Sequence, residues 1–334
     1  MIRFSENHSL KPHNTFGIDA KAKLYFSFTE AGDLKSDFLL NAHKTLIIGE
    51  GSNILFLDDF DGLVIRPNIK GMRQVGEDSR NVWIEAGAGE IWNEFVNHCV
   101  GLQLGGVENL SLIPGTVGAA PVQNIGAYGH EVANVIERVK GFNLDKKEYA
   151  EYLNDECDFG YRDSIFKRLL NNRFIITSVV FKLDKFPEFR LDYGNLREKV
   201  NSRGGVTLKN IKSAIDEIRM SKLPDVKELG SAGSFFKNPV IDIKLADYIK
   251  AKFGEAPVYN AGEGKVKIAA GWLVEKCGWK GFREGDAGVS DKQALVIVNY
   301  GKATGKDIFD LSEKIKQSVV DKFGIELERE VNCV

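Results

Sequence analysis

The chain has 334 residues, of which 43% are apolar and 28% charged, and its formal net charge is −2. This is the composition of a globular protein with two or three domains. The charge balance gives no reason to expect a nucleic-acid partner, and no apolar run approaches the roughly 18 residues of a membrane helix. The four cysteines form no CxxC pair. We therefore expect neither structural zinc nor disulfides, and predict a cytoplasmic location.

The first half of the chain has the pattern of short strands joined by glycine-containing turns. Apolar runs of strand length predict strands at three places: Leu46–Ile48, Leu63–Ile65 and Val82–Ala86. A helix is expected from Glu90 to Val100, ended by Gly101. The stretch LIPGTVGAAPVQNIGAYG, residues 112–129, is long, rich in glycine and poor in charge. A solvated linker would be more polar, so we expect this glycine loop to surround a ligand.

The pattern changes after a charged stretch, Asp184–Glu188, which suggests a domain boundary. Before it, Phe174–Leu183 predicts a long strand. After it, apolar spacing and stop residues predict three helices: from Ile211 to near Pro224, over Ile268–Cys277 and over Lys306–Phe323. Two further strands are expected, at Ala294–Asn299 and Ile325–Val331. The sequence therefore predicts two α+β domains that meet near residue 185.

The segment GEGSNIL, Gly49–Leu55, directly follows a predicted strand. Its two glycines allow a sharp turn with N–H groups directed inward, and Ser52 and Asn53 add side-chain donors, as a pyrophosphate requires. Ile54 takes the sixth position, so the segment is not the dinucleotide fingerprint of a Rossmann fold. Considered alone, it is more simply explained as a tight turn between strands.

Three shorter motifs carry side chains that could do chemistry. Ser234 lies in LGSAGSFFKNP, where glycines would give a substrate access to its hydroxyl, although capping is the commoner use of a serine. Arg162 in YRDS could clamp a carboxylate or make a surface ion pair. Glu328 and Glu330 of LEREV would share one face of a strand, as they would on an exposed edge. The sequence has no Walker A motif and no metal-binding histidine spacing, so we expect no metal.

Together and in this order, the motifs give a resemblance to the UDP-N-acetylenolpyruvoylglucosamine reductases, flavoenzymes of cell-wall synthesis. It covers nearly the whole chain, through NTFGIDAKA (Asn14–Ala22), GEGSNIL, the glycine loop, YRDSIFK, KLPD, GSFFKNP, GWLVEKCGWKG and LEREV. YRDS and LDYGNL (Leu191–Leu196) are similar to the branch of this family that carries a tyrosine-bearing loop over the substrate.

The resemblance implies an α+β fold. It consists of a vanillyl-alcohol-oxidase/PCMH-type FAD-binding domain of two subdomains, followed by a C-terminal α+β substrate-binding domain. We place the FAD-binding domain at residues 1–185, divided near residue 68, and the substrate-binding domain at residues 186–334. The implied reaction uses NADPH and non-covalent FAD. It reduces the enolpyruvyl group of a UDP-linked amino sugar to give UDP-N-acetylmuramate, a peptidoglycan precursor.

The same resemblance assigns site residues. Arg162 would stabilise the charge that develops on the substrate carboxylate, Glu330 would be its companion acid, and Ser234 would protonate the adjacent carbon. Substrate contacts are implied at Tyr161, Tyr193, Arg219, Lys222, Asn238 and Gln293. FAD contacts are implied at Gly49, Gly51, Ser52, Asn53, Leu55, Gly115, Thr116, Gly118, Ala119, Ile125, Gly126, Gly129 and Ile176.

Two features depart from the family pattern. Ser290 stands where relatives often carry histidine, and only four residues follow Glu330, so we expect its strand to be less firmly anchored. Two other functions stay open. One is an FAD-dependent oxidase of the same fold, which often tethers FAD through a histidine that these loops lack. The other is a non-catalytic UDP-sugar or flavin binder, which would need no proton donor. The family suggests a monomer, and no segment indicates NADPH over NADH.

Overall fold

The computed structural model describes residues 4–35 and 44–334. The chain forms two compact units. The first comprises residues 1–8, 22–50 and 61–219, and the second comprises residues 9–21, 51–60 and 220–334. The expected domain boundary at residue 185 and the subdomain division near residue 68 stay predictions. Across the described ranges, no helix combines the length and apolar character needed to cross a membrane.

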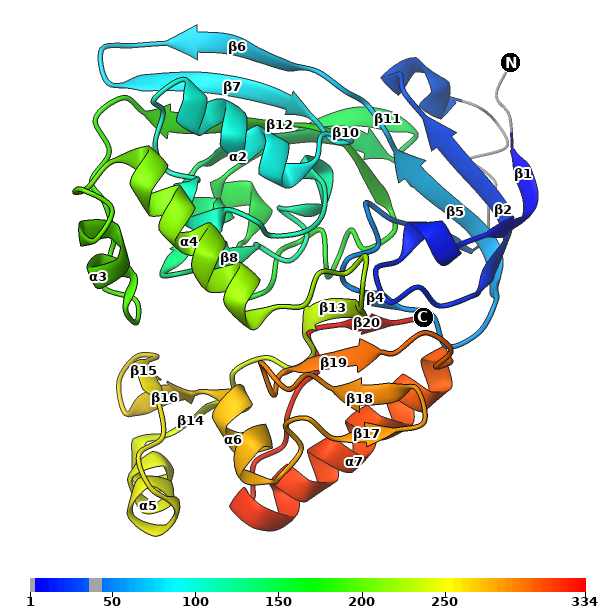
Figure 1. Ribbon diagram of the computed structural model, residues 1–334. Helices are drawn as coiled ribbons and strands as arrows, with labels where there is room; N and C mark the ends of the chain where they lie inside the picture. The colour runs from blue at the N-terminus through cyan, green and yellow to red at the C-terminus, as the bar shows by residue number, and fades with distance from the viewer. Residues whose placement is uncertain (1–3, 36–43) are drawn as a thin grey trace. The chain divides into compact units, whose positions relative to one another are not determined.

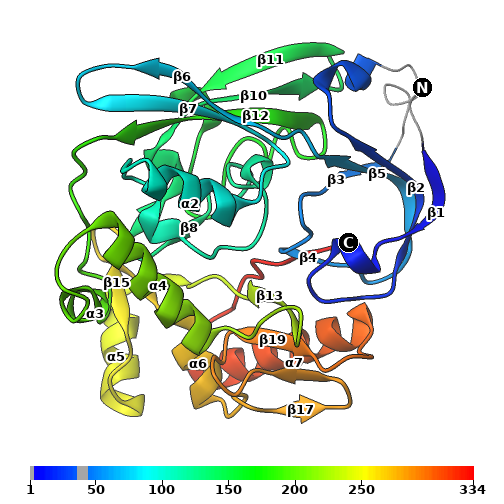
Figure 2. The same ribbon diagram turned by 45° about the horizontal axis from the view of Figure 1, so that its top comes forward.

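A five-stranded antiparallel sheet dominates the first unit (Figure 1), with strand order β11-β10-β12-β7-β6. Its strands are β6 (Met72–Glu77), β7 (Asn81–Gly87), β10 (Ile136–Asn143), β11 (Glu148–Leu153) and β12 (Phe174–Asp184). Helix α2 (Trp92–Gly101) lies on one face, as Figures 1 and 2 both show. Its Phe95 ring lies 4.4 Å from that of Phe181 on β12. This apolar contact anchors the helix to the sheet because both side chains are fully buried.

The first unit also contains most of a second sheet, which has four strands in the order β1-β2-β5-β3. Its strands are β1 (Ser5–Ser9), β2 (Lys21–Phe28), β3 (Thr45–Ile47) and β5 (Phe60–Pro67). The short strands β8 (Gly126–Ala127) and β9 (His130–Glu131) form a hairpin inside the glycine loop. Helices α3 (Leu196–Asn201) and α4 (Leu208–Lys222) share an apolar cluster that includes Leu191 and Ile215.

The second unit contains two small sheets and three helices. Strands β13 (Gly230–Ser234), β19 (Val296–Asn299), β18 (Ala287–Val289) and β17 (Arg283–Glu284) form one sheet, in that order. Strands β14 (Val240–Asp242), β16 (Lys265–Ile268) and β15 (Val258–Asn260) form the other. The helices are α5 (Ile243–Phe253), α6 (Ala270–Lys276) and α7 (Gly305–Phe323). Helix α7 lies along the first of these sheets, against β18 and β19 (Figure 1).

Short 3-10 helices connect many of these elements: η1 (Lys11–His13), η2 (Ala31–Lys35), η3 (Glu108–Leu110), η4 (Val117–Ala119), η5 (Val132–Asn134) and η6 (Asp155–Cys157). Two of them, η3 and η4, lie beside or within the glycine loop. The loop is therefore a chain of tight turns rather than an extended linker.

Most of the predicted elements are confirmed, and one is wrong. The predicted helices correspond to α2, α4, α6 and α7, and five predicted strands correspond to β3, β5, β7, β12 and β19. The predicted strand Ile325–Val331 is wrong, because this segment makes only an isolated bridge between Phe236 and Arg329. The strands β1, β2, β10 and β11 and the helices α3 and α5 are among the elements that were not foreseen.

The expected weak anchoring after Glu330 is also wrong. Strand β20 (Asn332–Cys333) pairs in parallel with β4 (Ile54–Leu55). In addition, the N–H of Val334 donates to the carbonyl of Leu55, at 2.9 Å. These backbone hydrogen bonds hold the end of the chain within the second unit.

Helix α7 begins in tight contact with the segment 51–60. A Cβ atom on Gly305 would lie 1.7 Å from the carbonyl oxygen of Phe56. We therefore predict that Gly305→Ala lowers the free energy of unfolding by about 1–3 kcal/mol or more, because backbone must shift to admit the methyl group. Urea denaturation measures this. Gly101→Ala is the control, since a Cβ there meets nothing within 4 Å. An equal loss in both variants would contradict the packing argument.

Candidate functional site

The YRDS turn is held to the glycine loop by three hydrogen bonds in the first unit. Arg162 donates from Nη2 to the carbonyl of Gly126 at 2.8 Å, and Ser164 donates from Oγ to the carbonyl of Val122 at 2.6 Å. In return, Asn124 of the loop donates from Nδ2 to the carbonyl of Gly160 at 3.0 Å. The structure thus brings the predicted catalytic Arg162 together with Gly126, a predicted cofactor contact.

Arg162 lies at a strained position. Its φ of 56° is in the left-handed region, which non-glycine residues seldom adopt. Its guanidinium also lies 5.6 Å from the centre of the Tyr161 ring. A strained backbone held by surrounding hydrogen bonds is typical of functional positions.

A second arginine, Arg219 at the end of this unit, is electrostatically coupled to Arg162. Burial and the charge of Arg162 lower the pKa of Arg219, against the opposing influence of Tyr128 and Asp216. The Nε atom of Arg219 is buried without a hydrogen-bond partner among residues 4–35 and 44–334. Two neighbouring guanidinium groups with an unsatisfied donor suit an anionic ligand such as a carboxylate or phosphate.

The predicted cofactor glycines of the first unit bring backbone segments very close together. A Cβ on Gly49 would lie 2.6 Å from Oγ1 of Thr116, and one on Gly118 would lie 2.6 Å from Cβ of Ala88. Gly115 and Gly129 have φ values of 131° and 79°, which favour glycine. Glycine at these positions allows close packing of neighbouring segments and backbone angles that other residues rarely adopt.

Three other predicted cofactor residues of this unit have apolar side chains. Ala119 ends the 3-10 helix η4, whereas Ile125 and Ile176 are buried in the main apolar core. Any contact that these two isoleucines make with a ligand would therefore come from their backbone or from the rim of the core.

In the second unit, the segment 51–55 is joined to Glu330. Asn53 donates from Nδ2 to the carbonyl of Glu330 at 3.0 Å. The backbone of Gly51 has a φ of 65°, and a Cβ there would lie 2.0 Å from the carbonyl oxygen of His13. Ser52 lies between Gly51 and Asn53 in the sequence, and Leu55 is fully buried in β4. A predicted cofactor contact and a predicted catalytic acid are thus neighbours.

Ser234 and Glu330 lie on adjacent backbone segments. The N–H of Glu330 donates to the carbonyl of Phe235 at 2.8 Å. Ser234 is exposed at the end of β13, where the register with β19 is irregular and Gly233 has a φ of 69°. Ser234 pairs with Val296 after this irregularity, and its side chain is exposed to solvent.

Asn238 and Gln293 gather at the first residues of α6. The N–H of Ala270 donates to Oδ1 of Asn238 at 2.9 Å, and Oε1 of Gln293 lies 3.0 Å from where a Cβ on Gly271 would be. Lys222, by contrast, is exposed at the end of α4. Ser290 is buried and accepts a hydrogen bond from the N–H of Lys292, so here it supports a turn.

The predicted site residues are divided between the two units. The first unit holds Gly49, Gly115, Thr116, Gly118, Ala119, Ile125, Gly126, Gly129, Tyr161, Arg162, Ile176, Tyr193 and Arg219. The second holds Gly51, Ser52, Asn53, Leu55, Lys222, Ser234, Asn238, Gln293 and Glu330.

Sequence reasoning missed Asn109, Tyr128 and His130, which lie in or beside the glycine loop. The Tyr128 ring meets the Tyr193 ring edge-on, with centroids 5.6 Å apart. Tyr128 could have been noticed as the only aromatic residue of residues 112–129. The importance of Asn109 depends on contacts that no local pattern reveals.

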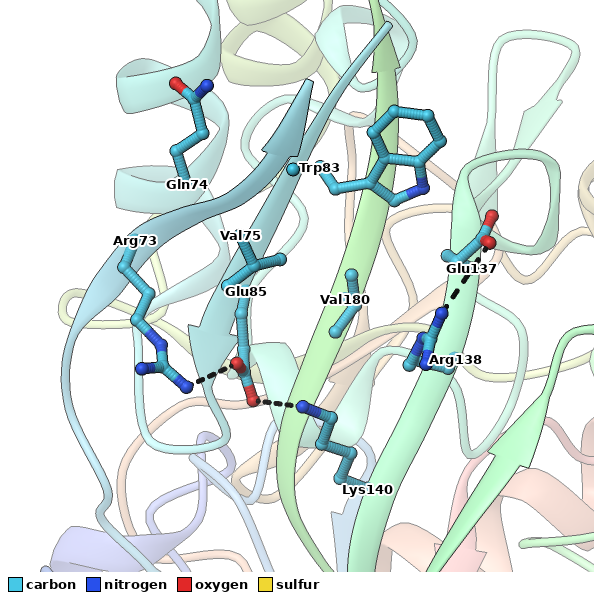
Figure 3. Close-up of a pocket in the computed structure, with 10 residues that line it drawn as sticks. Arg73, Gln74, Val75, Trp83, Glu85, Glu137, Arg138, Lys140 and Val180 are labelled. Atoms are coloured by element: carbon cyan, nitrogen blue, oxygen red, sulfur yellow. Dashed lines mark hydrogen bonds and ion pairs between the residues drawn. The ribbon is translucent and has the colours of Figure 1, made fainter. Parts of the chain in front are cut away.

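A groove of about 670 Å³ lies on the sheet face of the first unit, lined by Arg73, Gln74, Val75, Gly76, Trp83, Glu85, Glu137, Arg138, Lys140 and Val180 (Figure 3). No predicted site residue lines it. Glu85 lies between Arg73 and Lys140, at 2.8 and 3.0 Å from their nitrogens (Figure 3). Because its central charges are paired with one another, we interpret the charged lining of this groove as a network of cross-strand ion pairs rather than a ligand site.

The sequence matches two protein-family models and several known proteins. Residues 225–334 match the family model described as UDP-N-acetylenolpyruvoylglucosamine reductase, C-terminal domain, and residues 39–144 match that of an FAD binding domain. The chain is 45% identical to UDP-N-acetylenolpyruvoylglucosamine reductase of Flavobacterium johnsoniae, over 100% of both proteins. It is also 45% identical to the reductase of the same name from Chromobacterium violaceum, over 98% of both.

A solved structure of the same family has a similar fold. The crystal structure of UDP-N-acetylenolpyruvylglucosamine reductase from Thermus caldophilus superposes with a TM-score of 0.71 at 25% identity, covering 100% of this chain and 98% of the other. The expected α+β fold, with a PCMH-type FAD-binding domain and the C-terminal domain of this family, is confirmed.

The buried imidazole of His130 generates a pH prediction. Both ring nitrogens are buried without a hydrogen-bond partner in the described part of the chain. Burial, with the nearby charge of Arg190, lowers the pKa of His130 from 6.5 to about 4. The unfolded chain therefore takes up this proton first as the pH falls. His130 should cost no stability above pH 6.5 and should progressively destabilise the fold between pH 6.5 and 4.

We predict that His130→Gln flattens the fall in Tm over this range, measured by thermal denaturation at a series of pH values. His98→Gln is the control, because His98 is exposed on α2. An unchanged slope in the His130 variant would refute the assignment.

Proposed function

Because the chain belongs to the UDP-N-acetylenolpyruvoylglucosamine reductase family, we propose that Arg162, Ser234 and Glu330 perform the reaction of that family in it. The protein is an FAD-dependent oxidoreductase. It reduces UDP-N-acetylglucosamine enolpyruvate to UDP-N-acetylmuramate with NADPH, in peptidoglycan precursor synthesis. The observation that carries the residue assignment is the hydrogen-bonded pairing of Phe235, next to Ser234, with Glu330.

FAD, when bound, supplies the hydride that NADPH provides, and the chain must do the rest. The hydride enters the terminal methylene carbon of the enolpyruvyl group, and negative charge then develops toward the carboxylate. The protein therefore needs a preorganised cation for that charge and a proton donor for the adjacent carbon.

The residues near the glycine loop fit the cofactor. FAD needs a surface along which backbone N–H groups can approach its diphosphate closely. The close packing around Gly49 and Gly118 and the positive φ angles of Gly115 and Gly129 suit that requirement. We propose that FAD is held without a covalent bond by these segments and by the predicted residues listed above.

Arg162 is proposed as the cation that stabilises the substrate carboxylate. Its hydrogen bond to Gly126 and its constrained backbone hold the guanidinium in one orientation before substrate binds, so little reorganisation is needed during the reaction. Arg219, with its buried Nε, is proposed to add a second positive charge for the anionic substrate.

Ser234 is proposed as the proton donor and Glu330 as the companion acid. A serine hydroxyl is a weak acid, so it must act at short range on an intermediate that already carries charge. The exposure of Ser234 and the glycine before it permit that approach. Glu330 is oriented by two hydrogen bonds of its backbone, to Phe235 and from Asn53.

The remaining polar residues are proposed to bind the UDP-linked sugar. These are Tyr161, Tyr193, Lys222, Asn238 and Gln293. Tyr193 is partly exposed beside Tyr128 and is the residue we expect to close on the UDP group. We further propose, on the sequence grounds given above, that the enzyme is a cytoplasmic monomer without a nucleic-acid partner.

The proton-donor role proposed for Ser234 can be tested by mutation. Ser234→Ala should lower sugar-dependent NADPH oxidation by about 10²–10⁴-fold, because a general acid contributes that much. Flavin reduction by NADPH without the sugar should keep its rate. Stopped-flow absorbance of the flavin and steady-state absorbance at 340 nm measure the two steps.

Ser234→Cys serves as the conservative control and should recover part of the activity, since a thiol can donate a proton. Wild-type turnover in the alanine variant would refute the proton donor. Rapid oxidation of the reduced flavin by oxygen, with no response to the sugar, would favour an oxidase.

The role proposed for Gly49 in binding FAD can also be tested by mutation. Gly49→Ala should weaken FAD affinity about 5- to 150-fold, as ~1–3 kcal/mol of overpacking against Thr116 implies. Flavin content after dialysis, from absorbance at 450 nm, measures this. Adding Thr116→Ala removes the Oγ1 atom that lies 2.6 Å from the new methyl group. The double variant should therefore retain more FAD than the sum of the losses in the two single variants predicts. Losses of FAD that simply add would contradict a direct contact between the new methyl group and Thr116.

A further inference from the structure

Asn109 occupies a buried position between two segments that the proposed function uses. It lies in η3 and is 1% exposed. Its Nδ2 donates to the carbonyl of Tyr128 at 3.0 Å and to the carbonyl of Arg190, also at 3.0 Å. Since both partners are carbonyl oxygens, only an N–H₂ group can satisfy both at once.

The first of these carbonyls belongs to the tip of the β8–β9 hairpin. Tyr128 has a left-handed φ of 49° and precedes Gly129, a proposed cofactor contact. Its ring packs edge-on against Tyr193. The hairpin tip therefore touches the proposed substrate loop directly.

The second carbonyl belongs to that loop. Arg190 lies three residues before Tyr193. The next residue, Leu191, is buried in the apolar cluster of α3 and α4. Asn109 is thus the polar link, and Leu191 the apolar one, that holds the start of the loop.

We propose that Asn109 is a positioning residue, which places Tyr193 for the UDP-sugar by linking the Tyr193 loop to the glycine loop. This rests on the proposed function for the identity of the ligand. Without the link, Tyr193 would sample more conformations before binding, and the ordering would oppose substrate binding. The hydride and proton steps use other residues, so they should change less.

The test compares full-length holoenzyme variants. Asn109→Asp keeps the shape but replaces the donor group with a carboxylate that repels both carbonyls. Hydrogen exchange of residues 190–196 should become faster, and KM for UDP-N-acetylglucosamine enolpyruvate should rise about 10-fold. The kcat should change by less than about 3-fold, and flavin reduction by NADPH should be unchanged.

Two further variants separate positioning from general destabilisation. In a Tyr193→Ala background, Asn109→Asp should raise KM no further, because the pair acts through one contact. Asn14→Asp is the matched control, since the buried Asn14 also donates from Nδ2 to two carbonyls, those of Leu10 and Ile18, at 2.8 and 3.0 Å. It should lower Tm without accelerating exchange at residues 190–196.

The outcomes are distinct. The positioning role would be overturned if hydrogen exchange at residues 190–196 were unchanged in Asn109→Asp. It would also be overturned if the effects of Asn109→Asp and Tyr193→Ala on KM were additive. Both outcomes assume that the wild-type protein shows sugar-dependent turnover. A wild-type protein without sugar-dependent turnover would overturn the proposed function, whatever the exchange shows. Asn109→Ala, which removes the side chain without adding charge, should behave like Asn109→Asp and guards against misfolding caused by the carboxylate.

Discussion

The arrangement of the first unit depends on one constraint, the hydrogen bonding of the glycine loop. The loop is held partly by its own turns, in which the N–H of Ile125 donates to the carbonyl of Ala120, and partly by side chains from other segments. Ser164, Arg162 and Asn109 donate to the carbonyls of Val122, Gly126 and Tyr128 respectively. The residues that stabilise the loop are therefore also those that shape the site.

Arg162 shows how stability and function are combined in this arrangement. The hydrogen bond that supports Gly126 also orients the guanidinium, and the left-handed backbone at Arg162 persists because the turn around it is hydrogen-bonded on several sides. The second unit uses the same kind of link. Asn53 and Phe235 hold the backbone of Glu330 from two sides, while β20 holds the residues that follow.

Much of the fold was predictable because local patterns reflect burial. The apolar faces of α2, α4 and α7 have helical spacing, and their ends carry stop residues such as Gly324, which has a left-handed φ of 67°. The Ile325–Val331 prediction failed because alternating side chains indicate an extended backbone but cannot supply a partner strand. That segment meets a neighbouring strand at one bridge only.

By itself, the sequence determined the family and the chemistry of the candidate residues, since these depend on residue type and order. Only the tertiary structure decided which residues meet. Asn109 reaches a carbonyl 81 residues away, and Asn53 reaches one 277 residues away. The partners are backbone oxygens, which every residue carries, so no sequence pattern marks them. Such contacts are set by packing of the whole chain.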